Sequence, residues 1–180
     1  MLIMRKVLPA LLSLILFAAC DGGGGSGPTS PPPMPNANIQ GVWAGIASTV
    51  SARGTCLADA FQPVSVPVVW TIRQTGASVT AREVLNNALA CDFTGTVHGS
   101  SVTFSPDLRT SDALCSTQNL ACPGPRAVRI ELRTSASLFT GSVDANRMRI
   151  DSLAIWRVTE TSTGNTLGDY ELTGRQDLVR

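Results

Sequence analysis

Apolar and polar residues alternate with a period of two through most of the chain after residue 38. The cleanest run holds Val128, Ile130 and Leu132, which are separated by charged side chains. Because successive side chains of a β-strand point to opposite faces, the alternation indicates strands with one apolar and one wet face, typical of antiparallel sheets. The pattern therefore predicts an all-β domain, with strands at 40–50, 64–74, 77–84, 90–98, 101–105, 126–134, 137–144, 147–159 and 167–178.

Turn-forming residue pairs separate these runs, so we expect an antiparallel meander of eight to nine strands. A meander of eight strands closes naturally, and closure removes exposed sheet edges, so we prefer a closed barrel. A β-sandwich is the alternative. Two stretches are less regular. Residues 81–90 favour helix by composition, and residues 148–158 are apolar on both faces, which predicts a bulge or burial on two sides.

The N-terminal part has a different composition. Residues 1–19 join a short basic start to a 13-residue apolar run, which is too short to span a bilayer comfortably, and small residues precede Cys20. This arrangement resembles the signal of bacterial lipoproteins, which implies removal of residues 1–19 and acylation of Cys20 by palmitate or a similar chain. An ordinary secretory signal and an uncleaved anchor are the alternatives. Residues 20–37, rich in Gly, Pro and Ser, predict a disordered linker to the domain at 38–180.

The resemblance also implies a location. The domain is expected outside the cytoplasm, in the periplasm or at the cell surface of a bacterial envelope, with Cys20 as its membrane anchor. The choice between inner and outer membrane stays open.

Four further cysteines follow Cys20, and an even number in an exported domain predicts two disulfides. These cysteines are Cys56, Cys91, Cys115 and Cys122. Of the three possible pairings we favour Cys115–Cys122, which are close in sequence, together with Cys56–Cys91. The long segment 106–125 has no regular pattern, and we interpret it either as a braced surface insertion or as a functional loop at the barrel mouth.

Composition and motifs argue against several functions. The 14 basic and 13 acidic residues nearly balance, so we expect no nucleic-acid partner. No Cys-x-x-Cys is present and His98 is the only histidine, so we expect no metal site. None of the common hydrolase or phosphate-binding motifs occurs. His98 falls on a polar face beside a turn, and nothing sets the separation of Asp151 and Glu171. We therefore expect a protein that is not an enzyme and holds no cofactor, and we keep an enzyme of unknown type as a second alternative.

The first predicted strand contains Gly41-Val42-Trp43. This tripeptide resembles the Gly-x-Trp opening of the calycins, the family of lipocalin and avidin-like barrels. The resemblance implies that Trp43 closes one end of the barrel and that an arginine from late in the chain packs across it. Arg157 and Arg175 are the candidates.

Eight-stranded barrels have room for one small ligand. We therefore expect non-enzymatic binding of a small apolar molecule, lined by aromatic residues of the predicted strands. These residues are Trp43, Trp70, Phe93, Phe104 and Phe139. The alternative is a structural or interaction lipoprotein with a filled core, which binds an envelope protein through its outer face.

Overall fold

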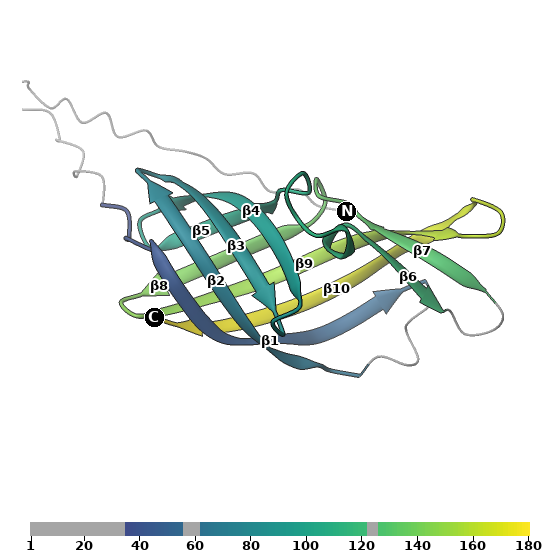
Figure 1. The fold of residues 1–180 in the computed structure, drawn as a ribbon, viewed down its shortest axis with the longest axis horizontal. Coiled ribbons are helices and arrows are strands. Elements are labelled where there is room, and N and C mark those ends of the chain that lie inside the picture. The colour runs from purple at the N-terminus through teal and green to yellow at the C-terminus, as the bar shows by residue number, and fades with distance from the viewer. Residues whose placement is uncertain (1–34, 56–61, 122–125) are drawn as a thin grey trace, which may run out of the picture. The chain divides into compact units, whose positions relative to one another are not determined.

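The computed structural model describes residues 35–55, 62–121 and 126–180. In these residues there are ten β-strands and one 3₁₀ turn, η1, and each of the nine predicted runs corresponds to one strand whose ends differ by at most a few residues. The elements are β1 (Gly41–Gly54), β2 (Ser65–Thr75), β3 (Ser78–Leu85), β4 (Leu89–His98), β5 (Ser101–Pro106), η1 (Ala113–Cys115), β6 (Thr117–Ala121), β7 (Ala127–Leu132), β8 (Leu138–Asp144), β9 (Arg147–Glu160) and β10 (Thr166–Val179) (Figure 1).

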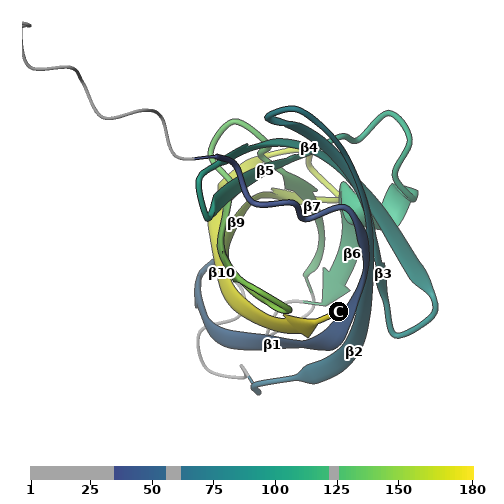
Figure 2. The ribbon, with the colours of Figure 1, turned by 90° about the vertical axis from the view of Figure 1, so that its left-hand side faces the viewer.

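Eight strands form a closed antiparallel barrel in meander order, β1-β2-β3-β4-β5-β8-β9-β10. Strand β10 pairs with β9 along one edge and with β1 along the other, which closes the ring (Figure 2). The predicted barrel is confirmed and the sandwich is excluded. Closure leaves no free edge among these eight strands, and one face of every strand points to a common interior.

Strands β6 and β7 form a hairpin beside the ring. The first half of β9 pairs with β8 as far as Leu153, and its second half pairs with β7 from Trp156 to Glu160. The hairpin therefore continues the sheet where β8 ends (Figure 1). Strand β6 was not predicted, because Thr117–Ala121 does not alternate and lies in the segment that we expected to be irregular. Pairing with β7 makes it a strand.

The two irregular stretches are both resolved as strands. Residues 81–90 form the ends of β3 and β4 and the turn between them, in which Asn86 and Asn87 have φ of 50° and 55°. Asparagine tolerates this left-handed region better than most residues do. In β9, Leu153 and Ile155 are half-buried on the outer face while alternate residues are buried inside, so burial on two sides is confirmed.

The segment before β1 crosses one end of the barrel and closes it (Figure 2). Ile39 is fully buried there, and its backbone N–H donates to Gln74 Oε1 at 2.8 Å. Gln74 Nε2 in turn donates to the carbonyl of Ala37 at 3.0 Å. The indole N–H of Trp43 donates to the Ile39 carbonyl at 2.8 Å. These bonds satisfy the polar groups that the crossing segment buries.

The last residue, Arg180, packs across Trp43 at this closed end. Its guanidinium carbon lies 4.9 Å from the centroid of the indole ring, a cation–π arrangement. Its Nη1 donates to the carbonyls of Asn38 and Gln40 at 3.3 and 3.2 Å. One side chain thus joins the C-terminus, the crossing segment and Trp43.

The expectation of an arginine from late in the chain is confirmed, but the choice of Arg157 or Arg175 was wrong. Both side chains are exposed, and Arg175 pairs with Asp151 across β9 and β10, with Nε 2.9 Å from Oδ1. In β9 and β10 the even-numbered side chains face the barrel interior, so the odd-numbered Arg157 and Arg175 point outward.

The main core fills the barrel next to the closed end. The ring centroids of Phe93 and Phe104 each lie 4.9 Å from that of Trp70. Burial of such large rings dominates core energetics. A second, smaller cluster around Trp156 and Tyr170 lies on the inner face of the extension formed by β7, β9 and β10.

A disulfide joins Cys91 on β4 to Cys115 in η1. The favoured pairing of Cys115 with Cys122 and of Cys56 with Cys91 was therefore wrong. The segment before η1 folds back on β4, where the Ala90 carbonyl accepts from the Asp112 N–H at 2.9 Å. This contact brings Cys115 to the buried Cys91. Disulfides are typical of exported domains, which agrees with a location outside the cytoplasm.

Cys20, Cys56 and Cys122 lie outside the described residues.

Candidate functional site

Three side chains form a polar layer across the barrel interior. The indole N–H of Trp70 on β2 donates to Gln176 Oε1 on β10 at 2.7 Å. Gln176 Nε2 donates to Glu83 Oε1 on β3 at 2.6 Å. Glu83 and Gln176 are 4% and 6% exposed, and they are the buried polar or charged residues of the described part of the chain.

The direction of this chain of hydrogen bonds is determined by its chemistry. An indole N–H can only donate, so the oxygen of the Gln176 amide must face Trp70. The amide nitrogen must then face Glu83, whose oxygen accepts. Gln176 is thereby held in one orientation, and it holds the Glu83 carboxyl toward the barrel axis.

A cavity of about 200 Å³ lies beyond this layer, on the side away from Trp43. Most of its wall is apolar or small, and strands β1, β2, β3, β8, β9 and β10 all contribute to it. The lining residues are Ala47, Ser48, Thr49, Val64, Val66, Glu83, Leu85, Phe139, Ser152, Ala154, Leu172, Gly174, Arg175 and Gln176.

Burial raises the pKa of Glu83 from 4.5 to about 7, and the hydrogen bond from Gln176 opposes this shift only in part. Desolvation has this effect because it penalises the charged form of a carboxyl group. Among the described side chains, Gln176 is the one hydrogen-bond partner of Glu83, through Oε1. The second carboxyl oxygen therefore has bonding capacity left, at the floor of a mainly apolar cavity.

The five aromatic residues expected to line a ligand site separate into two groups. Trp43, Trp70, Phe93 and Phe104 are buried in the main core. Phe139 lines the cavity, and its ring packs against Phe93 with centroids 5.2 Å apart. Trp70 takes part in the site indirectly, because it orients Gln176.

The polar residues considered from the sequence lie on the outer surface. His98 is exposed at the end of β4. Asp151 pairs with Arg175, and Glu171 pairs with Arg53 at 2.5 Å. Each carboxylate is thus neutralised by an arginine on a neighbouring strand, and the two are not presented to a common substrate.

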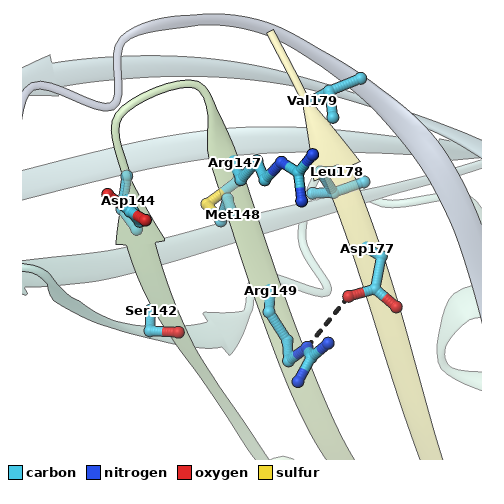
Figure 3. Close-up of a pocket in the computed structure, with 9 residues that line it drawn as sticks. Ser142, Asp144, Arg147, Met148, Arg149, Asp177, Leu178 and Val179 are labelled. Carbon is cyan, nitrogen blue, oxygen red and sulfur yellow. Dashed lines mark hydrogen bonds and ion pairs between the residues drawn. The ribbon is translucent and has the colours of Figure 1, made fainter.

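A larger hollow of about 510 Å³ lies on the outer face of β8, β9 and β10 (Figure 3). Its walls include Arg147 and the ion pair of Arg149 with Asp177, at 2.9 Å between Nε and Oδ1. Both side chains of that pair are more than half exposed. Water competes for such groups, so the smaller interior cavity is the better candidate site.

Sequence reasoning missed Glu83 and Gln176, although a signal for both was present. Glu83 shares the inward face of its strand with Val79 and Ala81, and Gln176 shares that of Leu178. A charged or amide residue in an apolar stripe predicts a buried polar group with a partner. The alternation therefore showed both positions, but it did not show that they meet.

Comparison with protein families, curated proteins and solved structures finds no match to this chain. No described helix has the length and apolar character needed to cross a membrane. No three His, Cys, Asp or Glu side chains of the described residues group together as metal ligands.

Proposed function

We propose that this protein is a lipoprotein of the bacterial cell envelope whose barrel binds a small, mainly apolar molecule without chemical change. The observation that carries the proposal is the interior cavity beyond the Trp70–Gln176–Glu83 layer. The closed end resembles that of calycins in the packing of Arg180 on Trp43, which supports a binding barrel over other uses of the fold.

The size of the cavity limits the ligand. An apolar cavity of about 150 Å³ holds one benzene molecule. At about 200 Å³, the cavity accommodates one ring with a short substituent, or a similar length of branched chain. A larger lipid would have to extend beyond the cavity into solvent.

Toluene is a suitable probe, and calorimetric titration measures its binding to the purified domain. Ala47→Leu fills the cavity from β1, and it is expected to weaken toluene binding at least tenfold. Ala44→Leu is the matched control, because Ala44 is exposed on the outer face of the same strand. The proposal fails if neither toluene nor its amine and alcohol derivatives bind, or if both variants bind the probe as the wild type does.

The anchor is tested separately in cells. Cys20→Ala removes the thiol that would be acylated, so we expect the protein to move from the membrane fraction to the soluble fraction. Two or more acyl chains hold a protein stably on a membrane, whereas a protein that lacks them dissociates. Continued dependence on detergent in the Cys20→Ala variant would contradict acylation at this residue.

A second candidate function is protein interaction through the outer face of β1. Val42, Ile46 and Val179 are 58%, 48% and 57% exposed, and they lie on the outer surface of neighbouring strands. Exposed apolar groups that adjoin one another are often interaction sites. Ile46→Glu is expected to abolish cross-linking to an envelope protein in cells while leaving toluene binding intact. Unchanged cross-linking would remove this candidate.

A further inference from the structure

We propose that the ligand of the barrel carries one positively charged amine, which pairs with Glu83 at the cavity floor while its apolar part fills the cavity. This inference rests on the proposed binding function and adds the chemical class of the ligand. The geometry that carries it is a buried carboxyl that faces an apolar cavity with one oxygen already bonded.

Glu83 is held in position before any ligand arrives. Trp70 orients the Gln176 amide, and that amide holds Glu83 Oε1 at 2.6 Å. Glu83 lies directly between Trp70 on β2 and Cys91 on β4 in the sheet register. The disulfide from Cys91 to Cys115 restrains the β4 side of Glu83. A group restrained in this way binds a partner with little loss of conformational entropy.

Among the described residues, no cation forms a hydrogen bond or an ion pair with Glu83, whose side-chain partner is Gln176. The other inward side chains that line the cavity or lie beside Glu83 in register do not titrate. They include Trp70, the disulfide-bonded Cys91, Phe139, Ser152 and Gln176. Arg82 is adjacent to Glu83 in sequence, but it pairs with Asp92 on the outer face. Arg175 borders the cavity, but its guanidinium pairs with Asp151 at the outer surface, with Nε 2.9 Å from Oδ1. The one buried charged group of the described barrel therefore lacks a countercharge.

A ligand amine supplies what the site lacks. Buried charges in proteins are normally paired, and the site offers a carboxyl group with a raised pKa that no protein cation pairs with. An ammonium group donates hydrogen bonds to a carboxylate and stabilises its ionised form. A neutral hydroxyl group provides the hydrogen bond without the charge, so a pair of ligands of equal shape separates the two effects.

The experiment compares benzylamine, benzyl alcohol and toluene by calorimetric titration at pH 8. Benzylamine is expected to bind the wild type roughly 10- to 100-fold more tightly than benzyl alcohol, the range of a charged hydrogen bond. Glu83→Gln preserves the shape of the side chain and is expected to remove this preference. Glu131→Gln on the outer face of β7 is the control, and it should leave the preference unchanged. At pH 5.5, where Glu83 is mostly protonated, the preference should shrink.

The outcomes distinguish this inference from the proposed function. If toluene binds but benzylamine and benzyl alcohol bind equally, the ligand class is wrong and the binding function stands. The same conclusion follows if Glu83→Gln keeps the preference for benzylamine. If none of the three probes binds the wild type, both proposals are wrong.

Discussion

The barrel interior on the two sides of the Trp70–Gln176–Glu83 layer is filled very differently. Toward the closed end, β1 contributes Trp43 and β9 contributes Met148, both of which are buried. Toward the cavity, the corresponding inward residues are Ala47 on β1 and Ala154 on β9. The alternation of apolar and polar residues is the same along both halves, so it does not distinguish them.

The size of the inward side chains makes the difference. Strand β10 shows the same change, from the buried Leu178 near the closed end to Gly174 at the cavity. In a barrel of fixed strand number the diameter is set, so small inward residues leave space. The packed half supplies stability, and the open half contains the cavity in which we propose that a ligand binds.

The largest expected effect is a difference in unfolding free energy between substitutions in the packed half and in the cavity half of the barrel. Phe104→Ala removes a buried ring of the packed half and should lower the free energy of unfolding by about 3–5 kcal/mol. Phe139→Ala removes a half-buried ring of the cavity wall and should cost roughly 1–2 kcal/mol. Urea denaturation measures both. Phe104→Leu serves if Phe104→Ala does not fold, and equal costs for Phe104→Leu and Phe139→Leu would contradict the comparison.

The next prediction concerns pH. The pKa of Glu83 is about 7 in the folded protein, whereas its ordinary value, which applies to the unfolded chain, is 4.5. As pH rises, the unfolded chain therefore releases this proton before the folded protein does. Stability therefore falls as pH rises from about 4.5 to 7, by about 3 kcal/mol, and Glu83→Gln should abolish that fall. The difference between wild type and variant, measured by denaturation across this range, cancels other titrating groups. A constant difference would show that Glu83 is not buried as described.

The disulfide beside the cavity is expected to contribute a similar amount. Cys91 and Cys115 are separated by 24 residues, and replacing both with serine should lower the unfolding free energy by about 3 kcal/mol. Peptide mapping without reduction should find these two cysteines linked. If Cys56 and Cys122 also pair, they must then pair with each other. A peptide that links Cys115 to Cys122 would contradict the structure.

The smallest effect is expected at the closed end. Arg180→Ala removes the cation–π contact with Trp43 and two bonds to backbone carbonyls, and it should cost about 1 kcal/mol because the arginine is exposed. Quenching of tryptophan fluorescence by acrylamide should also increase. Arg147→Ala, an exposed arginine at the same end of the barrel, is the control. Equal behaviour of the two variants would show that Arg180 does not seal the barrel.

Much of the fold was predictable because each strand signals itself locally. Alternation placed nine strands, and Gly41-Val42-Trp43 indicated which tryptophan lies at the closed end of the barrel. Strand β6 was missed because its residues show no alternation, and its partner strand makes it extended. The disulfide pairing was predicted wrongly because we used distance along the sequence as a guide to distance in space. The segment before η1 folds back on β4, and this brings Cys115 to Cys91.

The candidate site could not be predicted from the sequence for a related reason. Glu83 and Gln176 are separated by 93 residues, and Trp70 and Gln176 by 106. Closure of the ring and the register of three strands bring them to one level of the interior, and no local pattern carries that register.

The sequence alone was enough to predict the class of fold, nine of the ten described strands and the inward face of each of those nine, because these depend on side chains close together along the chain. Only the tertiary structure decided that the inward Glu83 meets Gln176, that Arg180 covers Trp43, and that Ala47 and Gly174 leave a cavity. These features depend on which residues of distant strands lie at the same height in the barrel, and that is settled when the ring closes.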